Sequence, residues 1–366
     1  MPVKVLLILI LLAGLVPLLR LALQSRVAWK RRLQGRSCVD ETTFWSIGGI
    51  TQAVQLRGWN EANPLLLYVH GGPGMPAMPF GHAFQSEWER HFTIVHWDQR
   101  VTGKTLCANG IETGLGLKDF AEDGVDLVRQ LQQRFPGRPI GIIGHSWGTA
   151  IAIRMLQAAP ELFAGYLAIG QVSDFLAAER YGYETVLAEA RRRGAAALVT
   201  SLTRFPNYPA GKSLSQASLS AVRAAEVKLG FGHHCKQSVT FKLLWLAFVS
   251  PDYRWSDLMK LANSKAQSAC LDIALSELPQ FFVSAAGVAV QCPVLMVGGS
   301  FDLFTPTPAA REFFETIHAP EKKFLEVVEL AHFGPLEDAP LFDRIVIGEF
   351  LPMIVNHTAS HARSKG

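Results

Sequence analysis

The stretch Gly144-His145-Ser146-Trp147-Gly148 decides the fold predicted for this chain of 366 residues. It follows PIGII at 139–143, an apolar run that predicts a buried strand, and it precedes TAIAIRMLQAA at 149–159, which has the pattern of a helix. A strand that turns sharply into a helix holds the central serine in a strained backbone, and the glycines on either side leave room for the close approach. The serine hydroxyl then lies above the carboxyl edge of a sheet, beside N–H groups that stabilise developing negative charge. The sequence therefore predicts a nucleophilic Ser146, supported by Gly144 and Gly148.

Short apolar runs alternate with longer helical patterns along the rest of the chain, which indicates an α/β fold with a mostly parallel sheet. A hairpin is expected at 44–57, a helix at 119–135, and buried strands at 64–70, 92–98, 139–144, 165–170, 293–298 and 323–328. Residues 172–282 carry helical patterns without a strand pattern, which predicts an inserted helical cap. The expected division is an N-terminal segment at 1–36, a core at 37–171 and 283–356, the cap at 172–282 and a polar tail at 357–366.

The composition excludes several classes of protein. Apolar residues make up 49% and charged residues 18%, so we expect a packed core and no extensive disorder. The net charge of +4 arises within the first forty residues, so nucleic-acid binding is not expected. The five cysteines form no C-x-x-C pair, which argues against a disulfide framework or a zinc site. His233-His234-Cys235 has metal-ligand residue types, but adjacent ligands point apart, and no metal is expected there.

The N-terminal segment predicts a membrane anchor. Val5–Leu19 is an unbroken apolar run, and a helix over 3–23, with Lys4 and Arg20 at its ends, is about 31 Å long and matches the hydrocarbon core of a bilayer. No small-x-small cleavage site follows, so an uncleaved single-pass helix in contact with membrane lipid is favoured over a signal peptide. The basic residues that follow place the rest of the chain in the cytoplasm, although glycosylation of Asn356-His357-Thr358 would argue for the opposite orientation.

The serine needs a base and an acid that orients the base. In the strand–turn–helix topology predicted here, the order along the chain is serine, acid, histidine. Asp302 lies just past the strand at 293–298, and His332 lies in the loop after the strand at 323–328. Among the eleven histidines, only His332 satisfies both the order and the position at a strand end. The alternative for Asp302 is a cap of the helix expected at 305–316.

Glycines after the strand at 64–70 predict an oxyanion hole. His70-Gly71-Gly72-Pro73-Gly74 allows a backbone N–H of Gly72 to approach the same oxygen as the N–H of Trp147. His70, Gly71 and Gly74 would shape this segment. The alternative is a plain Gly-Pro turn.

The segment DQRVTGKT at 98–105 follows the next strand and imitates the end of a phosphate-binding loop. The first glycine of such a loop is replaced by Asp98, so no phosphate site is predicted. Asp98 and Arg100 are instead expected to support the serine site.

HGGPG, DQR-x-x-G-K-T, GHSWGT, a late GG-x-x-D and a final AH, in this order, resemble the prolyl iminopeptidase group of α/β-hydrolases over about residues 45–355. The resemblance implies an eight-stranded sheet, a helical cap, no cofactor and removal of an N-terminal residue, often proline, from short peptides through an acyl-enzyme. The chain departs from the group at Val101 and Thr102, where a glycine and a small residue are usual. The resemblance also implies cap carboxylates that hold the free amine of the substrate, with Glu179, Glu184 and Glu226 as candidates.

Two other functions stay open at this point. A membrane-associated carboxylesterase or lipase would accept acyl esters, and the apolar stretch at 241–249 could line an acyl pocket or could simply be a buried cap helix. A non-catalytic relative would keep the pocket only to bind a ligand.

Overall fold

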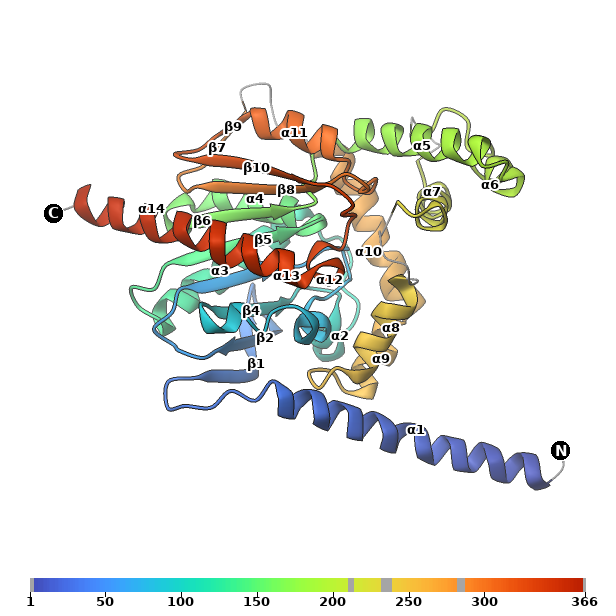
Figure 1. Ribbon diagram of the computed structural model, residues 1–366, viewed down its shortest axis with the longest axis horizontal. Helices are drawn as coiled ribbons and strands as arrows, with labels where there is room; N and C mark the ends of the chain where they lie inside the picture. Colours follow the sequence, from blue (N-terminus) through green and yellow to red (C-terminus); the bar gives the residue numbers. More distant parts are fainter. Residues whose placement is uncertain (1–2, 210–213, 232–238, 282–286, 365–366) are drawn as a thin grey trace.

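The computed structural model describes residues 3–209, 214–231, 239–281 and 287–364. Eight strands form one sheet in the order β1-β2-β4-β3-β5-β6-β8-β10 (Figure 1). The hairpin β1–β2 and the β2–β4 pair are antiparallel, and every other pair is parallel. These strands are β1 (Val39–Ile47), β2 (Ile50–Gly58), β3 (Leu65–Val69), β4 (Thr93–Asp98), β5 (Ile140–His145), β6 (Gly165–Ile169), β8 (Val294–Gly299) and β10 (Lys322–Val327). The predicted α/β fold with a mostly parallel eight-stranded sheet is confirmed.

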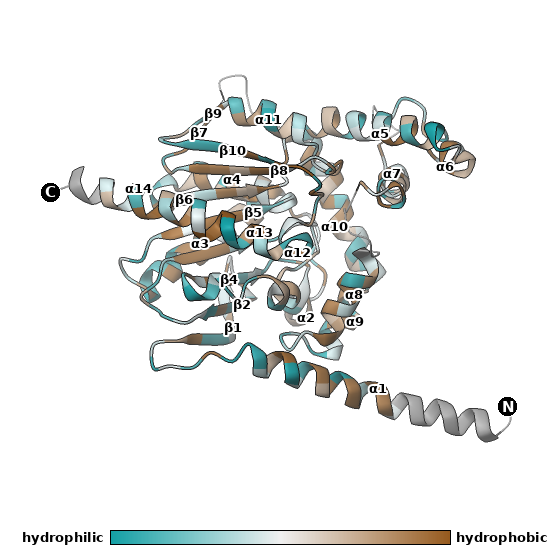
Figure 2. Ribbon diagram, viewed as in Figure 1, coloured by the Kyte–Doolittle hydropathy of each residue, from teal (hydrophilic) through white to brown (hydrophobic). Residues whose placement is uncertain are grey.

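Helices cover both faces of the sheet, as the βαβ pattern predicts. On one face α3 and α4 pack in a cluster in which Phe120 meets Trp147 edge to face, with ring centroids 5.6 Å apart. On the other face the final helices pack against Leu66, Leu167 and Leu295 of the strands. The central strands are brown in Figure 2 because they are apolar on both sides. The core helices are α2 (Gly103–Asn109), α3 (Leu117–Arg134), α4 (Trp147–Ala158), α11 (Thr307–Glu315), α12 (Gly334–Glu337), α13 (Ala339–Asp343), the π-helix η6 (Arg344–Phe350) and α14 (Leu351–Ser364), with short 3₁₀ turns η1 (Met78–Ala83), η2 (Trp88–Arg90) and η3 (Pro160–Leu162).

The interval between β6 and β8 is helical over most of its described residues and lies beyond one end of the sheet (Figure 1). Its elements are α5 (Phe175–Arg192), α6 (Ala196–Leu202), α7 (Gln216–Leu229), α8 (Val239–Val249), α9 (Trp255–Leu261), α10 (Ser264–Glu277) and η5 (Leu278–Gln280). A two-stranded ladder that the sequence did not reveal follows, with β7 (Val288–Ala289) paired to β9 (Ile317–His318). The divisions at 36, 171, 282 and 356 as domain boundaries stay predictions.

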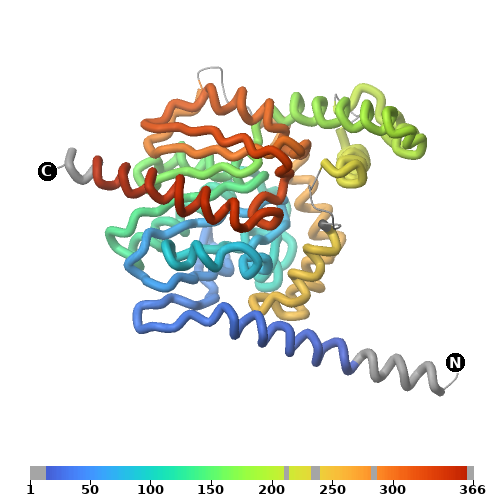
Figure 3. Tube along the Cα trace, in the orientation of Figure 1, coloured from blue at the N-terminus to red at the C-terminus, as the bar shows by residue number. Residues whose placement is uncertain are grey.

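The predicted membrane anchor is wrong. In the described ranges of the chain, no helix has both the length and the apolar character that crossing a bilayer requires. The N-terminal helix α1 runs from Val3 to Lys30, past the predicted end at residue 23, and its second half lies against α8 and the segment after it (Figure 3). Arg20, expected at a lipid interface, is 7% exposed and donates to the carbonyl of Tyr253 at 2.8 Å. The cytoplasmic placement and the lipid partner were inferred from that anchor and lose their basis with it.

Candidate active site

Ser146 occupies the turn between β5 and α4 with φ 53° and ψ −124°, a left-handed conformation that a non-glycine residue rarely adopts. Its N–H donates to the carbonyl of Ile169 at 3.0 Å, and its carbonyl accepts from Thr149. The flanking glycines are needed for space: a Cβ on Gly148 would lie 2.0 Å from the Val69 carbonyl oxygen, and one on Gly144 would lie 2.8 Å from the backbone of Thr149. The strained turn expected from the sequence is therefore present.

Asp302 and His332 are brought together from loops that follow β8 and β10. The Nδ1–H of His332 donates to Oδ2 of Asp302 at 2.9 Å. Thr305 adds two hydrogen bonds to the same carboxylate, from its hydroxyl at 2.8 Å and its N–H at 2.9 Å, and the N–H of Phe304 adds another at 2.9 Å. The carboxylate is thus held in one orientation. Because it binds Nδ1 of His332, it leaves the other ring nitrogen, Nε2, available.

The surroundings of Asp302 keep it ionised. Burial raises the pKa of this carboxyl, but the His332 imidazole and the hydrogen bonds from His332 and Thr305 outweigh burial, so the pKa lies below its ordinary value. An ionised partner fixes the tautomer of the imidazole and stabilises a positive charge on it.

The loop that carries His332 is fixed from two sides. Both oxygens of Glu337 accept backbone N–H bonds, from Ala331 at 3.0 Å and from Phe333 at 2.8 Å. The Nε2–H of His145 donates to the carbonyl of His332 at 2.8 Å. Burial and the nearby His332 lower the pKa of His145 to about 4, so this ring is neutral near pH 7 and serves as a hydrogen-bond donor.

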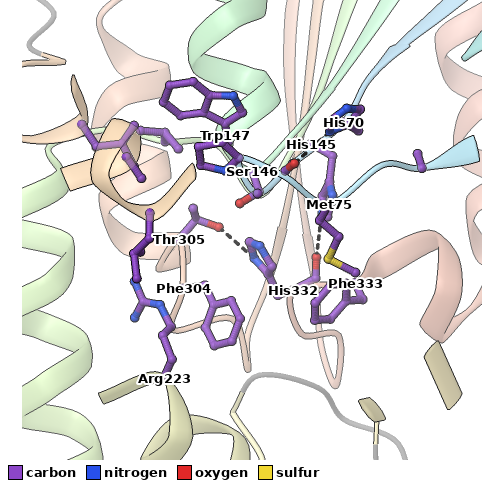
Figure 4. Close-up of a pocket in the computed structure, with 18 of the residues that line it drawn as sticks. His70, Met75, His145, Ser146, Trp147, Arg223, Phe304, Thr305, His332 and Phe333 are labelled. Carbon is purple, nitrogen blue, oxygen red and sulfur yellow. Dashed lines mark hydrogen bonds between the residues drawn. The ribbon is translucent and has the colours of Figure 1, made fainter. Parts of the chain in front are cut away.

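A cavity of about 730 Å³ lies between the sheet edge and the cap helices. Ser146 and His332 both line it, and Figure 4 shows their side chains next to each other at its wall. Gly72 and Trp147, the residues predicted for the oxyanion hole, line the same cavity. Asp302 lies behind His332 and is not among the described lining residues.

The glycine-rich segment after β3 runs beside the serine. Gly72 and Gly74 have φ of 115° and 89°, values that require glycine, and a Cβ on Gly71 would lie 3.1 Å from Cβ of Ser146. His70 holds the segment through Nδ1, which donates to the carbonyl of Gly71 at 2.9 Å. Burial lowers the pKa of His70 to about 4, so this histidine too is neutral near pH 7.

Asp98 and Arg100, expected to support the serine site, are not among the described residues that line the cavity. Asp98 accepts hydrogen bonds from the N–H of Lys104 at 2.7 Å and from the hydroxyl of Tyr253. Arg100 binds Asp123 of α3 at 2.6 Å. It also binds Glu112 and the carbonyl at the tip of the β1–β2 hairpin. Each residue ties the loop after β4 to neighbouring elements.

Val101 lies in that loop, at one of the two positions where the chain departs from the pattern of the prolyl iminopeptidase group. Its φ is 60° and it is buried, so this residue adopts a left-handed conformation that favours glycine. A β-branched residue in this conformation is strained by roughly 1–3 kcal/mol.

Two of the three cap carboxylates lie near the cavity. Glu179 and Glu226 are buried and both bind Arg223, which lines the cavity and stacks 4.9 Å from the ring centre of Phe304. Burial raises the pKa of Glu226 to about 8, against the opposing charge of Arg223. Glu184 is exposed on α5.

The apolar stretch at 241–249 forms α8, and none of its described residues lines the cavity. Phe241 and Leu244 are exposed, whereas Leu243 and Leu246 pack on the core. An acyl pocket built from this stretch is not supported. His233-His234-Cys235 lies outside the described residues, and within those residues no cluster of three metal-ligating side chains occurs.

Several residues of this site could not be read from the sequence. His145, Thr305 and Glu337 contact Asp302 or the loop of His332 through bonds that form only in the folded chain. The position of Thr305, three residues after Asp302, was the one available signal, because that spacing suits a carboxylate that caps following N–H groups. The contact of Tyr253 with Asp98 joins residues that are 155 positions apart in the sequence, so no local sequence pattern indicates it.

The fold and this arrangement define the class of protein. Residues 64–339 match the model of the α/β hydrolase fold family, so the chain belongs to that family and is a hydrolase. The chain is 28% identical over 299 residues to a probable aminopeptidase of Bacillus subtilis, covering 81% of this chain and 92% of that one. It is 24% identical over 312 residues to a proline iminopeptidase of Heyndrickxia coagulans, covering 85% and 98%. The structure of a proline iminopeptidase-related protein from Thermus thermophilus matches with a TM-score of 0.58 and 18% identity, over 87% of this chain and 99% of that one. The resemblance to the prolyl iminopeptidase group seen in the sequence is thereby confirmed.

Proposed function

We propose that this protein is a serine hydrolase that works through an acyl-enzyme. Ser146 attacks the carbonyl carbon of the substrate while His332 takes the proton of its hydroxyl and then passes it to the leaving group. Asp302 orients the imidazole and stabilises its positive charge. The N–H groups of Gly72 and Trp147 stabilise the oxyanion of the tetrahedral intermediate. Water, activated by His332, then releases the acyl group and restores the serine.

One observation carries the proposal. An ionised, fully hydrogen-bonded Asp302 holds His332 at 2.9 Å, and His332 shares the wall of one cavity with a serine in a strained turn. Backbone strain at a buried site persists only where the surrounding structure imposes it, and such strain is concentrated at functional residues. A merely structural serine would not need φ of 53° or glycines on both sides.

The test compares Ser146→Ala with Ser201→Ala, a serine of α6 away from the cavity lining. Turnover should fall by roughly 10³ or more in Ser146→Ala, because members of a catalytic unit fail together. A fluorophosphonate probe should label wild type and Ser201→Ala but not Ser146→Ala. Near-normal turnover of purified Ser146→Ala would refute the assignment.

For the substrate, we propose a short peptide that loses its N-terminal residue, as in an aminopeptidase of the prolyl iminopeptidase type. The names of the two relatives support this class. Glu179 and Glu226 are buried cap carboxylates that both bind Arg223, and Arg223 lines the cavity. Glu179→Gln should therefore raise KM for aminoacyl anilides and leave acyl esters unaffected, with exposed Glu184→Gln as the matched control.

A panel of aminoacyl anilides and acyl esters separates the peptidase from a carboxylesterase. Ester turnover without aminoacyl cleavage would reject the peptidase and keep the serine mechanism. A protein that binds without catalysis would show neither turnover nor labelling of Ser146.

A further inference from the structure

We propose that helix α1 is a positioning element for the glycine-rich segment at 70–74, acting through the loop at 250–253, Tyr253 and Asp98. This inference rests on the proposed function, because that segment supplies the oxyanion-stabilising N–H of Gly72. Its basis is a series of hydrogen bonds, joined by the peptide bond between Asp98 and Gln99, that leads from the surface helix to the backbone beside Ser146.

The first step is the docking of α1. Arg20 and Gln24 of the helix, and Arg31 directly after its last residue, all bind the same short loop between α8 and α9. Arg20 donates to the carbonyl of Tyr253 at 2.8 Å, and its guanidinium lies 5.9 and 5.5 Å from the ring centres of Phe248 and Trp255. Gln24 donates to the carbonyls of Ser250 and Tyr253, and Arg31 binds Asp252 at 2.8 Å. The helix therefore fixes both the backbone and a side chain of this loop.

The second step connects the loop to the end of β4. Tyr253 is 1% exposed, and its hydroxyl donates to Oδ2 of Asp98, which is fully buried. The same oxygen accepts the N–H of Lys104, whose ammonium lies 4.8 Å from the ring centre of Tyr253. A buried charge or dipole that loses one partner is costly, so the position of Tyr253 constrains Asp98.

The third step reaches the oxyanion segment. Gln99, the residue after Asp98, binds His70 twice: its backbone N–H donates to Nε2 at 3.3 Å, and its side chain donates to the carbonyl at 3.0 Å. Nδ1 of His70 in turn donates to the carbonyl of Gly71. These bonds fix the peptide that precedes Gly72, so a shift at Asp98 moves the N–H that faces the oxyanion. A displacement of about 1 Å at such a donor is enough to weaken catalysis strongly.

The test uses single substitutions in the full chain. Arg20→Gln breaks the first step and Tyr253→Phe the second, while Arg26→Gln changes an exposed arginine on the same helix. We expect kcat to fall about tenfold in the first two variants with KM within twofold of wild type, because an oxyanion donor acts in the transition state. Affinity for an aminoacyl trifluoromethyl ketone, which forms a tetrahedral adduct with the serine, should fall in parallel. A purely structural loss would instead lower the fraction of active protein, measured by fluorophosphonate titration.

Amide hydrogen exchange at 70–74 gives a readout that does not depend on catalysis. Exchange should be faster in Arg20→Gln and Tyr253→Phe than in Arg26→Gln. If Arg20→Gln fails to fold, Gln24→Ala tests the docking of α1 in its place, because it removes the bonds to the carbonyls of Ser250 and Tyr253. Tyr253→Phe, which removes only a hydroxyl, tests the second step. Unchanged exchange, or unchanged kcat in an enzyme that Ser146→Ala inactivates, would overturn the inference. Turnover that survives Ser146→Ala would overturn the proposed function instead. In that case the amide exchange rates at 70–74 still test whether α1 positions this segment.

Discussion

The substitution Asp302→Asn gives the sharpest test of the proposed mechanism. The asparagine oxygen can replace Oδ1 and keep the two N–H bonds from Phe304 and Thr305, each at 2.9 Å. The amide nitrogen then takes the place of Oδ2 and faces Nδ1 of His332, which is a donor in the wild type at 2.9 Å. The imidazole must present Nδ1 as an acceptor and move its proton to Nε2, where it can no longer take a proton from Ser146.

The expected loss is about 10⁴-fold in kcat, which corresponds to about 5.5 kcal/mol of transition-state stabilisation. KM should change little, because Asp302 does not line the cavity that holds the substrate. Steady-state kinetics on an aminoacyl anilide and an acyl ester measure both constants, and thermal unfolding checks that the variant is folded. A folded Asp302→Asn within tenfold of the wild-type kcat would show that His332 does not depend on this carboxylate.

Two further substitutions test the packing and the electrostatics. Gly148→Ala would force its Cβ to 2.0 Å from the Val69 carbonyl, so urea unfolding should show a loss of about 3 kcal/mol or failure to fold, whereas Gly348→Ala, with nothing within 4 Å, should change stability little. The pKa of Glu226, raised to about 8, means that the folded chain keeps a proton that the unfolded chain has released above its ordinary pKa near 4.5, so this group makes stability fall as pH rises between those values. Glu226→Gln should remove that contribution, and an unfolding free energy with the same pH dependence as wild type would contradict it.

The central strands β3, β4, β5, β6 and β8 could be predicted because each is a short apolar run buried on both faces, and such runs carry their signal locally. Ser146 could be predicted for the same reason: the glycines that its turn requires are two residues away. Asp302 and His332 could be predicted from their positions just after strands, because the carboxyl ends of parallel strands lie at one edge of a sheet. These placements follow from topology alone and need no knowledge of side-chain contacts.

The N-terminal helix shows where that reasoning fails. The hydropathy pattern places Arg20 at the end of a membrane-spanning helix. In the structure, its partners Phe248, Tyr253 and Trp255 lie more than 225 residues later in the chain. The burial of a charged side chain depends on such distant partners, so a window along the sequence cannot detect it. Thr305 and His145 were missed in the same way, because their roles arise from atoms brought close only by folding.

Asp302, the proposed acid, lies behind His332 and outside the described lining of the cavity. Arg223, Leu219 and Leu271, which contribute to that lining, come from the inserted helices, whereas Asp302 and its hydrogen-bond donors come from the sheet edge. Changes in α7 and α10, which carry these three residues, are therefore expected to alter the acyl donor that the proposed site accepts while the hydrogen bonds of Asp302 and His332 stay in place.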